Sequence, residues 1–229
     1  MNLLFIEGFQ RILIVLILVS IVIAISRRNL ISLINTFAIQ SLVLSVLVLL
    51  IYLEERNLNL VYLCTLTFAS KCILIPFFLK KTRKSMNIYV DLQYNMFTPT
   101  ASIFSSLILF SMLFFSLSFI KDQLEITSLN YVGIVVGLSL LFIGMLMIIG
   151  RKKIISKIIG YLMMENGVVL MSIFLGDLPF LIEALIFMDL LMLLAISSIL
   201  GFGMDSSVEE FHAKLNPFRN WLKKVNKEW

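Results

Sequence analysis

Residues 160–170 read GYLMMENGVVL, and the carboxylate of Glu165 stands there beside the amide of Asn166. Apolar residues fill most of the surrounding run, residues 156–176, which is long enough for a helix that crosses a bilayer. An ionised side chain that faces lipid at the bilayer centre costs several kcal/mol. The stretch therefore predicts a membrane helix whose Glu165 faces other helices or water, with partners from other apolar runs.

The composition of the whole chain predicts an integral membrane protein. Of its 229 residues, 60% are hydrophobic and only 14% are charged, and the mean hydropathy is +1.01. Soluble domains contain about 25% charged residues, and several runs here exceed the roughly 18 apolar residues of a candidate membrane helix. No water-soluble domain fits between these runs. We therefore expect an all-α fold with one transmembrane domain over residues 1–203.

Seven apolar runs are candidate transmembrane helices. They cover residues 5–25, 30–53, 58–79, 99–120, 129–149, 156–176 and 179–203. The first run has neither a basic leader nor a small-residue cleavage motif, so we predict a retained helix rather than a signal peptide. The fourth follows Thr98-Pro99, a pair that favours a helix start.

The basic residues alternate between the links that join these runs. Fifteen of the 19 Lys and Arg residues lie in four segments, within residues 27–28, 80–84, 151–157 and 214–227. The intervening links contain only Arg56 and Lys121. Because Lys and Arg accumulate on the cytoplasmic side of membrane proteins, the pattern predicts an N-terminus outside and a C-terminus inside. It also explains the net charge of +5 without a nucleic-acid partner.

The tail, residues 204–229, is expected to leave the membrane on the inner side. Its apolar residues Phe218, Leu222, Val225 and Trp229 are spaced by three or four positions, with basic residues between them. This spacing predicts a short amphipathic helix. Such a helix can lie in the membrane interface or dock on a partner subunit, and the sequence is compatible with both.

A group of glycines marks the fifth run. Gly133, Gly137 and Gly144 are spaced so that they lie on one helix face. Small residues at these positions let another helix approach closely. We expect this face to pack inside the molecule.

Four ionisable residues lie well inside the predicted spans: Lys71, Glu165, Glu183 and Asp189. Lys71 and Glu165 are each about eight or nine residues from the inner ends of their helices, or roughly 12–14 Å. Asp189 is about ten residues into the last run, near its middle, whereas Glu183 is closer to the outer end. We expect Lys71, Glu165 and Asp189 to share one layer of the bundle.

These four side chains suit the movement of protons. Burial and a neighbouring lysine shift the pKa of a carboxyl group in opposite directions, so a group subject to both can titrate near neutral pH. We predict that Glu165 and Asp189 carry protons, that Lys71 tunes Glu165 or relays, and that Glu183 links to the outer side.

Water and amide side chains within the spans are expected to bridge the groups of this relay. The candidates are Asn166, Asn35 and Gln40. The alternative is that the buried charges form a structural ion pair that only holds helices together. In that case, removal of a charge harms assembly and transport together.

The chain lacks the usual residues of a redox or metal site. No histidine lies in a span, and no glycine-rich nucleotide loop is present. Cys64 and Cys72 are about 12 Å apart along one helix, too far for a disulfide, and we expect them to be packing residues. We therefore predict no catalytic residue, cofactor or metal in this chain, so that partners supply any redox chemistry.

Three segments resemble a known family. They read TLTFASKCILIPFFLKK at residues 65–81, GYLMMENGVVLMSIFLG at residues 160–176 and PFLIEALIFMDLLMLLAISSILGFG at residues 179–203. In this order they are similar to component E of the hydrogenase-4 type, a membrane subunit of group 4 nickel–iron hydrogenases that include formate hydrogenlyases. The last three predicted helices, residues 129–203, resemble the K subunit of complex I and the C subunit of Mrp-type antiporters.

The resemblance implies roles for two carboxylates. Glu165 matches the carboxylate in the second helix of the K subunit. Asp189 falls near the carboxylate in its third helix, where this chain has Asp instead of Glu. The K subunit has three helices, so the likeness to it assigns no role to Lys71.

The resemblance also implies a non-catalytic, multi-pass subunit of an oxidoreductase complex in the cytoplasmic membrane. The implied partners are antiporter-like and complex I-like membrane subunits and a peripheral redox arm with a nickel–iron centre and iron–sulfur clusters. Electron transfer in these partners would be coupled to movement of protons or another ion through the membrane arm.

Two other functions fit the same residues. One is a subunit of an Mrp-type cation/proton antiporter without redox function, and the other is a purely structural membrane scaffold. A stand-alone carrier fits less well, because the sequence contains no internal transporter repeat.

Overall fold

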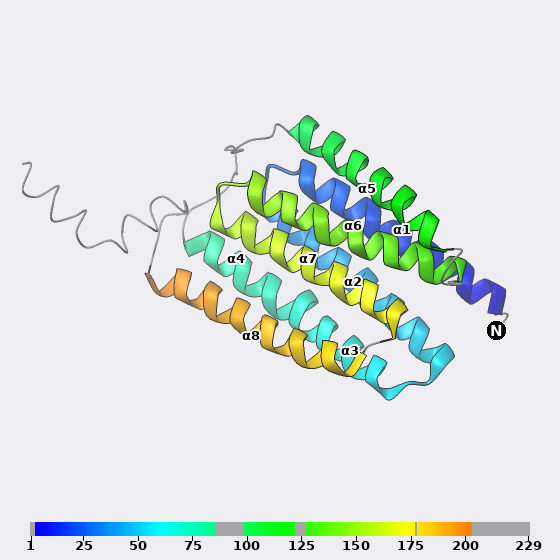
Figure 1. Cartoon of the computed structure of the whole chain (residues 1–229). Helices are drawn as coiled ribbons and strands as arrows, with labels where there is room; N and C mark the ends of the chain where they lie inside the picture. The colour runs from blue at the N-terminus through cyan, green and yellow to red at the C-terminus, as the bar shows by residue number, and fades with distance from the viewer. Residues whose placement is uncertain (1–2, 86–98, 122–126, 177, 203–229) are drawn as a thin grey trace, which may run out of the picture.

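The computed structural model describes residues 3–85, 99–121, 127–176 and 178–202 (Figure 1). Within these ranges the chain folds into helices and forms no strand. The helices are α1 (Leu3–Ser26), α2 (Leu30–Glu55), α3 (Leu58–Thr67), the π-helix η1 (Phe68–Leu74), α4 (Ile75–Ser85), α5 (Pro99–Lys121), α6 (Ser128–Gly150), α7 (Ile154–Leu175) and α8 (Leu178–Phe202). The all-α prediction is confirmed over these residues, whereas the predicted tail helix in 204–229 lies outside them.

The apolar runs of the sequence match these helices closely. Among the described residues, six helical stretches are long and apolar enough to cross a membrane, one of them the continuous series α3–η1–α4, and this indicates a membrane protein. The seventh predicted run is α8, in which the described apolar stretch Ala184–Ser198 is shorter. The fourth run begins at Pro99, as its sequence predicts.

The helix ends follow local sequence signals. Asn29 and Asn57 cap α2 and α3, because each side chain accepts a hydrogen bond from the backbone two residues on, at 3.0 and 3.1 Å. α7 ends at Gly176, whose φ of 89° is left-handed and suits glycine. Arg56 ends α2 in the same region of φ, at 58°.

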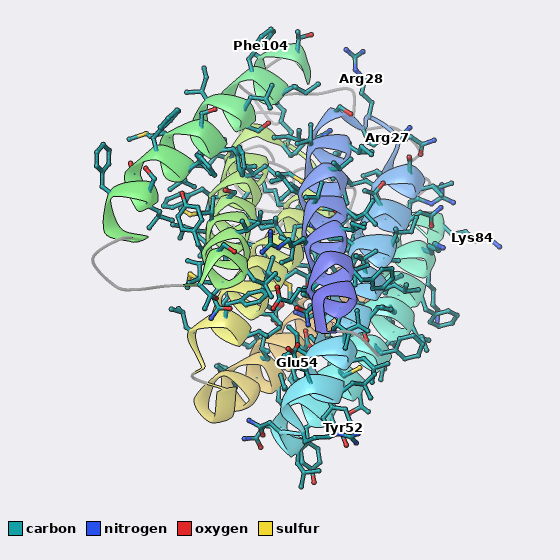
Figure 2. The ribbon with its side chains drawn as sticks, turned by 90° about the vertical axis from the view of Figure 1, so that its right-hand side faces the viewer. Arg27, Arg28, Tyr52, Glu54, Lys84 and Phe104 are labelled. Carbon is teal, nitrogen blue, oxygen red and sulfur yellow. The ribbon has the colours of Figure 1, made fainter. Side chains whose placement is uncertain are left out.

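The charged ends of the helices segregate along the bundle. In Figure 1 the C-terminal ends of α1 and α4 and the link between α6 and α7 lie toward the left, here called the basic end because Arg27, Arg28, Lys84 and Arg151 belong to these segments, whereas the C-terminal end of α2 lies toward the right; Figure 2 shows Arg27 and Arg28 well apart from Tyr52 and Glu54. Alternate basic links therefore meet at one end, as the predicted topology requires. Which side of a membrane that end faces stays a prediction.

The closest helix pair is the antiparallel hairpin α6–α7 (Figure 1). A Cβ atom added to Gly137 would lie 2.8 Å from the carbonyl oxygen of Gly167, and one added to Gly144 would lie 2.8 Å from that of Gly160. A Cβ atom at Gly133 would meet the ring of Phe174. The predicted glycine face thus packs inside the molecule, on α7.

Candidate functional site

A buried ion pair joins η1 to α7. Nζ of Lys71 lies 3.0 Å from Oε1 of Glu165, and the two side chains are only 1% and 5% exposed. Glu165 is eleven residues beyond Ile154, where α7 begins, or about 16 Å along the helix. The pair therefore lies near the middle of the bundle, far from both helix ends.

A second carboxyl group joins the pair from α8. Asp189 is 4% exposed, and its Oδ2 accepts a hydrogen bond of 2.7 Å from the hydroxyl of Ser70. The carboxyl groups of Glu165 and Asp189 interact electrostatically with each other. Lys71, Glu165, Asp189 and Ser70 are called the central cluster below.

The π-helix η1 supplies both the lysine and the serine of the central cluster. Ser70 and Lys71 are consecutive, yet Ser70 bonds a residue of α8 and Lys71 pairs with a residue of α7. The backbone N–H of Ile75 donates to the carbonyl of Ser70, a five-residue spacing. π-Helical turns are rare and occur frequently at functional sites, so this local geometry is a further reason to place function here.

The hydroxyl of Ser70 can hydrogen-bond Asp189 in either protonation state of that carboxyl group. It lies 2.8 Å from the carbonyl oxygen of Leu66 and 2.7 Å from Oδ2 of Asp189. A hydroxyl has one proton and two acceptor lone pairs. It can therefore donate to Asp189, or donate to Leu66 while it accepts from a protonated Asp189.

The amide of Asn166 extends the site toward α2. Its Nδ2 donates to the hydroxyl of Ser41 at 2.9 Å, and both side chains are buried. Gln40 is completely buried on the same helix as Ser41. Both amide atoms of Gln40 and Oδ1 of Asn166 have no hydrogen-bond partner among the described residues. Asn166 thus connects α7, beside Glu165, to α2, on which Gln40 is a second buried amide.

One residue predicted for the relay, Asn35, is not part of this arrangement, and the structure does not place the side chain of another, Glu183. The side chain of Asn35 is exposed on α2 and does not join the central cluster. Glu183 lies in α8, but its side chain is outside the described residues. The side chain of Glu183 is thus not placed, and its outward link stays a prediction.

Tyr161 lies one turn before Glu165 on α7, toward the basic end. Its phenol interacts electrostatically with Glu165 and Asp189, and its hydroxyl donates to the sulfur of Met188 at 2.9 Å. Neither Tyr161 nor Ser70 was predicted from the sequence. The available signal was position: Ser70 adjoins Lys71, and Tyr161 is four residues from Glu165.

Two faces of α7 explain why Glu165 points to its partners. Gly160 and Gly167 face α6, where the backbones approach closely. Glu165 and Asn166 face η1 and α2 instead. Because the α6–α7 contact is so tight, it fixes the rotation of α7 and therefore the position of Glu165.

Arg151 is a buried residue that the sequence placed only as a topology signal. It is 2% exposed, and its Nη2 donates to the carbonyl oxygens of Ile25 at 3.0 Å and Arg27 at 2.6 Å. These carbonyls lie at the C-terminal end of α1, where the last helix carbonyls have no partner within the helix. Arg151 thus connects the α6–α7 link to the end of α1.

The described residues contain no cluster of three or more His, Cys, Asp or Glu side chains that could hold a metal ion. Cys64 and Cys72 are free thiols.

Comparison of the chain with known proteins finds no matching family model, no matching curated protein and no matching solved structure.

Proposed function

We propose that the chain is a non-catalytic membrane subunit that carries protons, or another small cation, through the central cluster. The observation that supports this is the contact of Lys71, Glu165 and Asp189 near the middle of three apolar helices. Intramembrane ionisable groups are rare and commonly mark ion pathways. A site with one lysine and two carboxyl groups is neutral when it binds one proton, and it gains a negative charge when that proton leaves.

The polar residues around the cluster support a path on both sides of it. Tyr161 extends it toward the basic end, whereas Asn166, Ser41 and Gln40 extend it toward α2. The unpaired amide atoms of Gln40 and Asn166 are suitable partners for water, because buried polar groups usually bind protein or water. Protons would move through these waters to the carboxyl groups of the central cluster, where the hydroxyl of Ser70 positions Asp189.

The proposed setting is a complex I-like, hydrogenase-related complex in the cytoplasmic membrane. It follows from the sequence resemblance to component E of the hydrogenase-4 type. In this setting, the N-terminus is outside, the C-terminus is inside, and the nickel–iron centre and iron–sulfur clusters belong to partner subunits. The central cluster is compatible with this role. A buried site that binds and releases protons could couple electron transfer in the partner subunits to the movement of ions across the membrane.

Charge removal in membrane vesicles tests the ion path. We expect Asp189→Asn, and the double variant Lys71→Met/Glu165→Gln that leaves no unpaired charge, to leave the complex assembled, as judged by native gels, while proton uptake measured with a pH-sensitive dye falls by at least tenfold. Ser198→Ala, on the exposed side of α8, serves as the matched control. Normal proton uptake in both carboxyl variants would refute the path, and joint loss of assembly and uptake would favour a structural scaffold.

Purification of the complex in mild detergent tests the setting. Partners that resemble a hydrogenase large subunit, together with nickel and iron, are the expected result. Antiporter subunits without iron would refute the redox setting and would assign the central cluster to a cation/proton exchanger.

A further inference from the structure

Two links of the chain meet at the basic end. Nη2 of Arg151, in the link between α6 and α7, donates to the carbonyl oxygens of Ile25 and Arg27, where α1 ends. Because Arg151 is only 2% exposed, this contact is enclosed and fixes the α6–α7 link against the end of α1. The α1–α2 link and the α6–α7 link therefore lie side by side.

These two links concentrate positive charge. The side chains that are exposed or half-buried there, called the basic junction below, include Arg27, Arg28, Lys152 and Lys157. No Asp or Glu occurs within residues 8–53 or 127–164, so the segments that form the junction contribute no carboxylate. Like charges on adjacent links repel one another, and a bound anion would offset this repulsion.

The basic junction lies where the apolar spans end. The span Ile6–Ser26 ends one residue before Arg27, and the span Ile154–Leu175 begins two residues after Lys152. The polar headgroups of a bilayer lie directly outside its hydrocarbon core, so lipid phosphates would lie at the level of these side chains. Basic groups between membrane helices at this depth are suited to anionic headgroups.

One face of α1 continues the site into the hydrocarbon region. Leu16, Val19 and Ile23 are 47%, 46% and 39% exposed, and their spacing of three or four residues continues to Arg27. Leu16 is eleven residues from Arg27, or about 16 Å, which is roughly half of the ~30 Å hydrocarbon core. An acyl chain of one leaflet can therefore lie along this face while its phosphate contacts the basic junction.

We propose that the basic junction binds an anionic phospholipid, whose phosphate contacts the guanidinium and ammonium groups and whose acyl chain lies along the apolar face of α1. A headgroup with net negative charge is favoured over a zwitterionic one, because the segments of the junction offer no carboxylate to a choline or ethanolamine group. The lipid would hold the end of α1 against the α6–α7 hairpin. This binding requires neither proton transfer by the central cluster nor a redox partner.

Lipid titration of the delipidated full chain in mild detergent tests the proposal. Phosphatidylglycerol and phosphatidylcholine with identical acyl chains are compared at equal mole fraction in mixed micelles, with thermal unfolding as the readout. We expect saturating phosphatidylglycerol to raise the unfolding temperature by about 5 °C more than phosphatidylcholine does. Inorganic phosphate and glycerol 3-phosphate, which lack acyl chains, are expected to cause no shift.

Matched removal of three charges locates the site. We expect Arg27→Gln/Arg28→Gln/Lys152→Gln to lower the apparent affinity for phosphatidylglycerol about 100-fold, since each lost charge lowers it about fivefold. The carbonyl that Arg151 contacts remains in this variant, so it should unfold with the parent when no lipid is added. The control removes three exposed charges from α4 at the same end, Lys80→Gln/Lys81→Gln/Lys84→Gln, and should lower the affinity by less than about fivefold.

A conservative variant and a single variant complete the test. Arg27→Lys/Arg28→Lys retains both charges and is expected to keep most of the affinity, whereas Arg28→Gln alone should lower it about fivefold. If the triple variant at the junction cannot be purified, an unchanged affinity in Arg28→Gln overturns the proposal. Equal shifts with both lipids, equal losses in the two triple variants, or equal stabilisation by inorganic phosphate would also overturn it.

Discussion

Nζ of Lys71 lies 3.0 Å from Oε1 of Glu165, and the pair is buried where η1 meets α7. Neither charge has access to bulk water, so each is stabilised by the other. Loss of one partner leaves the other charge uncompensated in a low-dielectric interior. Loss of both partners removes the attraction between them and also the cost of burying two charges.

This dependence predicts unequal effects of single and double substitutions. Lys71→Met alone is expected to destabilise the protein by about 3–5 kcal/mol, and the double variant Lys71→Met/Glu165→Gln by much less. Thermal unfolding in detergent, followed by loss of the monodisperse peak, measures this. Lys80→Met, an exposed lysine on α4, is the control. Additive losses in the double variant would show that the two residues are not coupled.

The contact of Ser70 with Asp189 predicts a defect in transport without a defect in folding. Ser70→Ala removes the only hydroxyl that bonds Asp189 among the described residues, whereas Ser70→Thr retains a hydroxyl. Loss of one hydrogen bond of about 1 kcal/mol corresponds to a roughly fivefold slower proton uptake. We expect Ser70→Thr to restore most of the rate. Equal rates in Ser70→Ala and the parent would exclude the hydroxyl from the path.

The sequence predicted the helices well because the bilayer imposes a length on them. Runs of about 20 apolar residues are sufficient to locate such helices, and Asn29, Asn57 and Gly176 mark their ends by local chemistry. Helix positions also predicted that Lys71, Glu165 and Asp189 lie at similar depth. Their contact follows from that shared depth, whereas their role in proton transfer stays a prediction.

The rotation of each helix about its axis and the local backbone geometry could not be predicted from the sequence. Asn35 is exposed while Gln40 is buried on the same helix, a difference that depends on how α2 packs. The π-helix η1 leaves no mark in a hydropathy pattern, because it changes hydrogen bonding and not composition.

The glycine contacts of α6 and α7 predict which small substitutions are harmful. A Cβ atom at Gly167 would lie 2.6 Å from the carbonyl oxygen of Gly137, a backbone atom that cannot move alone. We expect Gly167→Ala to lower stability by about 1–3 kcal/mol and to displace Glu165. Gly8→Ala, where nothing lies within 4 Å of the added atom, is the control. If both variants unfold at the parent temperature, the close contact is not required.

The hydrogen bonds of Arg151 predict that the stability of the protein depends on the position of this guanidinium and not only on its charge. Arg151→Gln removes hydrogen bonds from a charged donor to the end of α1, each worth about 1.5–3 kcal/mol. Arg28→Gln removes one exposed positive charge from the same end, so it controls for topology. We expect only Arg151→Gln to lower the unfolding temperature, with weak rescue by Lys because an ammonium lacks the planar fork. Equal effects of Arg151→Gln and Arg28→Gln would indicate that charge alone matters.

The π-helix predicts an unusual tolerance to deletion. The N–H of Ile75 bonds the carbonyl of Ser70 five residues earlier, so deletion of Ile73 would convert this bond to the four-residue spacing of an α-helix. The segments α3 and α4 could then keep their own contacts, because the extra residue of the π turn is what is removed. The directions of Ser70 and Lys71 relative to α8 and α7 would change. We expect this deletion variant to assemble but to lose proton uptake.

Deletion of Thr65 within α3 is the control, since it rotates the following residues by about 100° and should prevent assembly. Normal uptake after deletion of Ile73 would show that the π turn is not needed to hold the central cluster.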